Sequence, residues 1–362
     1  MDSSFLFGIS TMAYILAMII YITYLAFKKT QIGITATTIT IVGFVSQTLA
    51  IALRWKEFYD LSQMGFLRSA PLTNLYESLI FFVWCLILGY LIIEFRFKNR
   101  SFGAFVTPVA GLALAFIDIS GMTKEIQPLV PALQSNWLLV HVMMSFIAYA
   151  TFALSFSTAL MYLILTTERK NEGAYIFWTV TSGIFVIVLL AMGIDFLAFK
   201  VTVKWPEEFI TGFLFKASFL NPSTVVKILS YLAASVMLFA LWKYGSVLKR
   251  VIRAFNISDE ILDEITYKSI AVGFPVFTLG GLIFGAIWAD QAWGVYWSWD
   301  PKETWSLITW FVYAFYLHSR MIRGWRGKKV AIVAVIGFVA VIFTYIGVNL
   351  LLSGLHAYGG LE

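Results

Sequence analysis

Residues 137–166 read WLLVHVMMSFIAYATFALSFSTALMYLILT and contain no aspartate, glutamate, lysine or arginine. About 20 apolar residues in a helix are enough to cross the roughly 30 Å hydrocarbon core of a bilayer. This uncharged run therefore predicts a membrane-spanning helix, and it decides the class of the fold.

The whole chain has the composition of an integral membrane protein. Of its 362 residues, 60% are hydrophobic and 13% are charged, whereas soluble domains have roughly 45–50% apolar and 25% charged residues. We therefore expect an all-α polytopic bundle of about eight to ten transmembrane helices. Ten apolar runs mark the predicted spans: 4–27, 36–53, 75–95, 103–118, 137–166, 175–199, 226–242, 269–288, 303–319 and 330–352. The two shortest runs are 226–242 and 103–118, which contains Pro108. For each of these two, a re-entrant segment is the alternative to a full span.

Basic residues indicate the orientation of the bundle. The odd-numbered loops between the predicted spans hold 17 of the 26 lysines and arginines, and the even-numbered loops hold 9 when Lys227, at the start of the span 226–242, is counted with them. Since basic residues accumulate in cytoplasmic loops, both termini are predicted to lie outside the cytoplasm. The net charge of +6 follows from this topology signal and does not favour nucleic-acid binding. The first span lacks a small-residue cleavage site and is expected to remain as an anchor.

The single cysteine, Cys85, lies inside the predicted span 75–95. One cysteine forms neither an intramolecular disulfide nor a C-x-x-C pair, so thiol–disulfide chemistry by this chain alone is excluded. We interpret Cys85 as a small buried hydrophobic residue.

Residues 288–310 read WADQAWGVYWSWDPKETWSLITW and hold six of the thirteen tryptophans. Asp300, Pro301 and Glu303 are typical of a helix start, with a capping aspartate, a proline in the first turn and a capping-box glutamate. Large flat π surfaces beside the membrane suit a flat, conjugated ligand. The alternative interpretation is an aromatic belt, in which tryptophans only mark the headgroup level.

The chain has only three histidines, His141, His318 and His356. His141 and His356 are predicted at the outer surface, level with the tryptophans. His318 follows Asp300 by 18 residues, which places it roughly 27 Å further along the helix, near the cytoplasmic end. Two imidazoles beside an aromatic shelf suit the axial positions of haem iron, whereas zinc would lack a complete ligand set. Each histidine could instead hydrogen-bond a neighbouring helix.

Four segments together resemble the haem-handling proteins of system II cytochrome c maturation, the CcsA/ResC (CcsB) family with its tryptophan-rich WWD signature. They are TNLYESLIFFVW at 73–84, WLLVHVMMSFIAYATFALSF at 137–156, the tryptophan segment continued to residue 320, and GVNLLLSGLHAYGG at 347–360. The resemblance divides the chain into anchoring spans at 1–69 and a haem-handling membrane domain at 70–362, with the WWD segment at 288–305.

The resemblance implies residue roles. His141 and His356 match two external ligands of haem iron, and His318 matches the histidine of an inner transmembrane haem site whose second ligand comes from a ResB-type subunit. The haem-binding platform is implied to comprise Trp293, Tyr296, Trp297, Trp299, Asp300 and Trp305. Asp300 is expected to act primarily as the helix cap.

The implied function is transport of haem b across the membrane and its presentation to apocytochrome c for thioether attachment at a C-x-x-C-H motif. The chain would be the membrane subunit of a holocytochrome c synthase, with catalysis mostly by positioning. Implied partners are a ResB/CcsB-type subunit, apocytochrome c and thiol-reducing membrane proteins. The location would be a bacterial cytoplasmic membrane, or a thylakoid membrane if the gene is plastid-encoded.

Two alternatives stay open. A system I relative would deliver haem to a chaperone, and a non-haem transporter or quinone-binding subunit would use the tryptophans only to hold its outer gate. Among local details, Asn74 and Glu77 have the spacing of a helix cap and its capping-box partner. The basic residues Arg54, Lys56, Arg68 and Lys302 lie on the outer side and could bind haem propionates, but such residues are more often only solvated.

Overall fold

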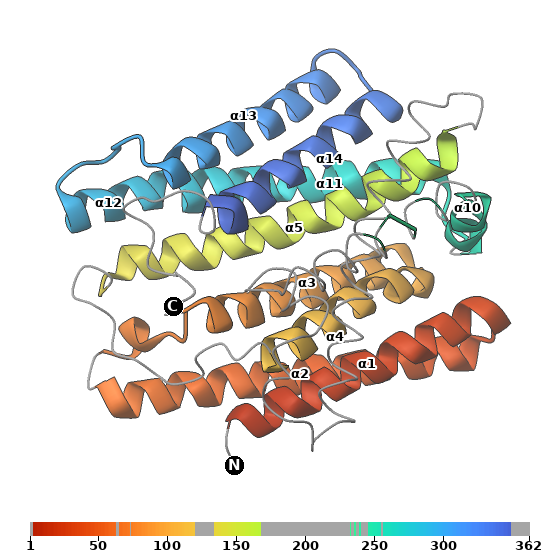
Figure 1. Cartoon of the computed structure of the whole chain (residues 1–362), viewed down its shortest axis with the longest axis horizontal. Coiled ribbons are helices and arrows are strands. Elements are labelled where there is room, and N and C mark those ends of the chain that lie inside the picture. Colours follow the sequence, from red (N-terminus) through yellow and green to blue (C-terminus); the bar gives the residue numbers. More distant parts are fainter. Residues whose placement is uncertain are drawn as a thin grey trace.

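The computed structural model describes residues 3–62, 65–72, 74–119, 134–167, 245–254 and 256–348, with isolated positions at 232, 235, 236 and 239. Every regular element in this part of the chain is helical, and Figure 1 shows the long helices lying side by side. The protein is an all-α polytopic membrane protein, as the composition predicts.

Helices α1 to α5 form the first part of the bundle. Their bounds are α1 Ser3–Phe27, α2 Thr30–Ser62, the 3₁₀ turn η1 Phe66–Ser69, α3 Leu75–Phe97, the 3₁₀ turn η2 Arg100–Phe102, α4 Gly103–Ile119 and α5 Asn136–Thr166. The second part contains two π-helical segments. Its bounds are α10 Gly245–Ala254, α11 Asp259–Phe277, the π-helix η4 Thr278–Phe284, α12 Gly285–Trp293, α13 Pro301–Met321, α14 Lys328–Ile342 and the π-helix η5 Phe343–Gly347.

Eight of the ten predicted spans coincide with helices of the structure, and the other two, 175–199 and 226–242, lie outside the described residues. Six helical stretches in the described part are long and apolar enough to cross a membrane. One of them is the continuous rod Asp259–Trp293, which begins ten residues before the predicted start at 269. The helix extends beyond the predicted apolar run because its first turn is acidic and Ser258 caps it by accepting a hydrogen bond from the amide of Ile261.

Helix α5 occupies the centre of the bundle (Figure 1) and packs against α3 on one side and against α11 and α14 on the other. Small buried residues such as Ala148 and Ala159 let neighbouring backbones approach closely, as in other membrane helix pairs. Phe152 fills the contact with α13, where its ring stacks on Tyr313 at a centroid distance of 3.8 Å.

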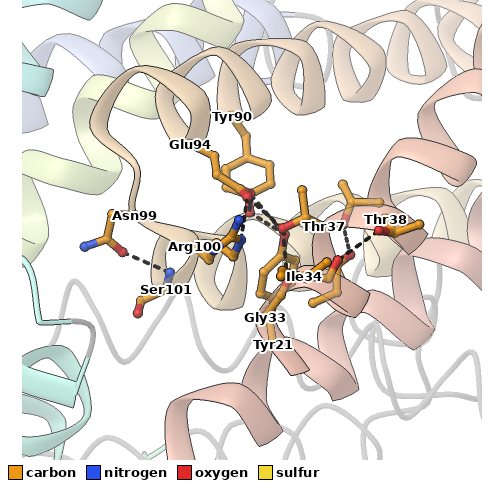
Figure 2. A network of polar contacts seen from close by, with 12 residues as sticks. Tyr21, Gly33, Ile34, Thr37, Thr38, Tyr90, Glu94, Asn99, Arg100 and Ser101 are labelled. Atoms are coloured by element: carbon orange, nitrogen blue, oxygen red, sulfur yellow. Dashed lines mark hydrogen bonds and ion pairs between the residues drawn. The ribbon is translucent and has the colours of Figure 1, made fainter. Parts of the chain in front are cut away.

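A buried carboxylate joins the first three helices. Figure 2 shows Glu94 of α3 surrounded by hydroxyl groups from α1, α2 and its own helix. Glu94 accepts hydrogen bonds from Thr37 at 2.6 Å, from Tyr21 at 3.1 Å and from Tyr90. The Arg100 Nε lies 3.6 Å from the same carboxylate. Because buried polar groups are costly without partners, this network fixes the packing of α1 and α2 against α3.

Candidate functional site

Helices α3, α5 and α13 all begin at one end of the bundle (Figure 1), which we call the tryptophan end and which includes the loop of residues 294–300 between α12 and α13. The predicted start of α13 is confirmed. Asp300 accepts a hydrogen bond from the amide of Lys302 at 3.0 Å, and Glu303 accepts from the amide of Asp300 at 3.2 Å. Pro301 occupies the first turn. Asp300 is buried, and Glu303 also accepts a hydrogen bond from the amide of Ser298 at 2.8 Å, which ties the preceding loop to the start of α13.

The loop presents aromatic side chains on its surface. Trp299 is 69% exposed and Tyr296 is 61% exposed, whereas Trp297 is half-buried. The Trp297 and Trp299 rings lie edge to face, with centroids 5.9 Å apart. Trp299 also has a positive φ of 61°, a conformation that costs a bulky residue on the order of 1–2 kcal/mol. Backbone strain beside an exposed aromatic surface is typical of functional sites.

Trp288 and Trp293 belong to α12, the helix that precedes this loop. Trp288 is buried and contacts Trp293 at a centroid distance of 4.8 Å. On its other side Trp288 stacks on the imidazole of His141, with centroids 6.2 Å apart and ring planes 16° apart. The structure thus brings His141 and two tryptophans of the WWD segment together, although the histidine is 147 residues before Trp288 in the sequence.

His141 lies in the second turn of α5 and is half-buried. Its Nδ1 is 2.8 Å from the carbonyl oxygen of Gly280, within the π-helix η4. A carbonyl can only accept a hydrogen bond, so Nδ1 carries a proton, and in the neutral imidazole Nε2 then carries the lone pair. An imidazole in this tautomer can ligate a metal through Nε2.

Trp305 and Trp310 have packing contacts within the bundle. The Trp305 ring lies 4.1 Å from that of Phe343 in η5, and its carbonyl accepts a hydrogen bond from Thr344. Trp310 donates its indole N–H to Thr278 at 2.9 Å. These two tryptophans pack α13 against both π-helical segments. The haem contact that the resemblance implies for Trp305 stays a prediction.

The other two histidines lie away from this group or outside the described residues. His318 is exposed near the far end of α13, two residues before Arg320, which pairs with Asp263 of α11 at 2.8 Å. His356 lies outside the described residues. The convergence of His141 and His356 therefore stays a prediction.

The sequence analysis did not predict two features of this end, the burial of Arg54 against Glu77 and the small pocket that these two residues line. Arg54 was named as one of four outer basic residues that could bind propionates but are more often solvated; it is buried, and its Nε lies 2.9 Å from Glu77 Oε1. Arg54 and Glu77 both line a small pocket together with Phe81 and Met143. Met143 is two positions after His141 in α5. Asn74 caps α3 as predicted, accepting a hydrogen bond from the Glu77 amide. The sequence did contain a signal for this ion pair. Arg54 and Glu77 lie at the edges of apolar runs, where charged residues usually pair.

The fold and the site together define a polytopic helical membrane protein that presents tryptophans, backed by a half-buried histidine, at one end. The chain belongs to the cytochrome c assembly protein family, whose family model matches residues 72–356. This match covers the described helices from α3 to η5 and includes all three histidines.

Relatives define the branch of the family. The chain is 38% identical over 334 residues to the cytochrome c biogenesis protein CcsA of Marchantia polymorpha, covering 89% of this chain and 88% of that protein. It is 36% identical over 360 residues to CcsA of Microcystis aeruginosa, covering 98% and 97%. The chain is thus a CcsA-family protein of cytochrome c biogenesis, a process that involves haem.

Proposed function

We propose that this protein transports haem b across the membrane and presents it at the tryptophan end to apocytochrome c, as the membrane subunit of a haem lyase. One observation carries the proposal more than any other. A fixed imidazole, His141, is stacked on a buried tryptophan of α12, the helix that leads into the exposed aromatic loop.

The residues at this end suit haem as a substrate. Nε2 of His141 can ligate iron, and the exposed rings of Trp299 and Tyr296 can support a porphyrin face. In this proposal His356 supplies the second axial ligand, and the ring edge that bears the vinyl groups stays accessible to the thiols of the apocytochrome. The protein then contributes to attachment chiefly by holding the ring in one orientation.

A second, inner haem site is part of the proposal. His318 is exposed on α13, whose residues 303–319 the sequence predicts to span the membrane, and an ionisable side chain is costly on a lipid-facing surface. A ResB-type partner subunit that covers this face and supplies a second histidine would remove that cost. Haem would enter at this site and leave at the tryptophan end. The location would be the bacterial cytoplasmic membrane or a thylakoid membrane.

The test is purification of the complex from haem-sufficient cells, followed by absorbance spectroscopy and an assay of holocytochrome c yield. We expect a Soret band that His141→Ala weakens together with the cytochrome c yield, and a co-purifying ResB-type subunit. Absence of the band from the wild-type complex would contradict haem binding and favour the non-haem alternative. Co-purification with a haem chaperone instead would favour the system I alternative.

A further inference from the structure

We infer that the π-helix η4 and two glycines, Gly280 within it and Gly285 directly after it, are the positioning device that fixes the tautomer of His141 and directs Nε2 toward a ligand. The key contact is the 2.8 Å hydrogen bond from His141 Nδ1 to the carbonyl of Gly280. The inference that this bond tunes haem binding rests on the proposed function, whereas the tautomer is a property of the protein alone.

The π-helix explains why this carbonyl can accept a side-chain hydrogen bond. In a regular α-helix the Gly280 carbonyl would face the amide four residues later along the helix axis. In a π-helix its backbone partner would be the amide of Gly285, but that amide donates to the carbonyl of Leu282 instead. The Gly280 carbonyl thus lacks its regular π-helical partner, and it lies 2.8 Å from His141 Nδ1 on α5. Single π-helical turns inside long helices occur frequently at functional sites.

The glycines explain why the imidazole can come so close. A Cβ atom at Gly285 would lie 2.8 Å from His141 Nδ1, and one at Gly280 would lie 2.2 Å from the Cβ of Met144. Side chains at these two positions would push α5 and the ring away from η4 and the start of α12. Trp288, one turn after Gly285, covers the ring face. Three groups therefore fix the imidazole ring: the Gly280 carbonyl, the Gly285 backbone without a Cβ, and the Trp288 indole.

The chemical consequence follows from the hydrogen bond. A carbonyl that accepts the Nδ1 proton raises the basicity of Nε2 and orients the ring, and loss of such a contact typically weakens metal binding about 10- to 100-fold. A more basic imidazole stabilises ferric iron relative to ferrous iron. The Gly280 carbonyl is thus expected to tighten haem binding and to lower the midpoint potential of the bound haem.

The first test needs no haem. The chain has only three histidines, so protein labelled with ¹⁵N-histidine gives few signals in solid-state NMR, and His141→Gln assigns the one in question. We expect His141 in haem-free protein to carry its proton on Nδ1, with an unprotonated Nε2. A His141 protonated on Nε2, or a mixture of both tautomers, would overturn the inference even if haem binding is confirmed.

The second test uses Gly285→Ala, with Gly8→Ala as the control because a Cβ at Gly8 meets no atom within 4 Å. We expect Gly285→Ala to shift the His141 signal away from the Nδ1-protonated form, to weaken haem binding about 10- to 100-fold and to raise the midpoint potential. Gly8→Ala should change none of these. Wild-type tautomer, affinity and potential in Gly285→Ala would contradict the positioning role. A wild-type protein that has the expected tautomer but binds no haem would support this device and refute only the proposed function.

Discussion

Arg54 and Glu77 form an ion pair inside the bundle, with Nε and Oε1 separated by 2.9 Å and side chains only 4% and 1% exposed. The pair joins α2 to the first turn of α3, near the tryptophan end (Figure 1). Removing one member of a buried pair leaves the other charge uncompensated, whereas removing both is often tolerated.

This pair gives a double-mutant prediction. Arg54→Leu and Glu77→Leu should each lower the free energy of unfolding by about 3–5 kcal/mol, and the double variant should recover most of that loss. Reversible unfolding in detergent measures all three. If the double variant loses the sum of the two single losses, the residues act independently and the pair has no coupling energy.

The Glu94 network gives a prediction for the N-terminal helices. Glu94→Ala should cost about 1–3 kcal/mol for each buried hydroxyl that loses its acceptor, because Tyr21, Thr37 and Tyr90 all donate to this carboxylate (Figure 2). Arg100→Gln is the matched control. It should have a much smaller effect, because the arginine side chain is 37% exposed and its Nε is 3.6 Å from the carboxylate. Equal losses would mean that the ion pair, and not the hydroxyls, stabilises the network.

Two tryptophans of the WWD segment should respond in opposite ways. Trp299→Gly should keep the free energy of unfolding within about 1 kcal/mol of wild type, because the side chain is exposed and glycine tolerates the positive φ. It should weaken haem binding by up to about tenfold, the equivalent of roughly 1.4 kcal/mol. Trp288→Ala should instead destabilise the protein by about 3–5 kcal/mol, since this ring is buried.

Thermal unfolding and haem titration of both variants check this contrast. A Trp299→Gly variant with wild-type haem affinity would remove that ring from the proposed platform. A Trp288→Ala variant of wild-type stability would contradict its role in packing against His141.

The predicted orientation can be tested with cysteine labelling. The only native cysteine, Cys85, is buried and can be replaced by alanine. In that background Val295→Cys, in the exposed tryptophan loop, should react with a membrane-impermeant maleimide in intact cells. Arg323→Cys, at the opposite end of α13, should react only after permeabilisation. The reverse pattern would place the tryptophan end in the cytoplasm.

The sequence predicted those parts of the fold that depend on local chemistry. The uncharged run 137–166 is α5 almost residue for residue, because length and hydrophobicity alone determine a membrane helix. The cap at Asp300 was predictable for a similar reason, since Asp-Pro-x-Glu satisfies the first amides of a helix from within four residues.

Features that depend on distant contacts were not predictable. The sequence around Gly280 does not predict a π-helix. The Gly280 carbonyl is hydrogen-bonded to His141, which is 139 residues away in the sequence. The burial of Arg54 likewise depends on a partner in the next helix. One sequence shows which residues can pair or ligate, but packing decides which of them meet.

Electron paramagnetic resonance of the ferric haem complex tests the central claim most directly. With two imidazole ligands, one of them His141, the wild-type complex should show a low-spin signal. His141→Gly should convert it to a high-spin signal, and added imidazole, which can occupy the vacated ligand position, should restore the low-spin form. An unchanged low-spin signal in His141→Gly would show that His141 is not an iron ligand and would contradict the account.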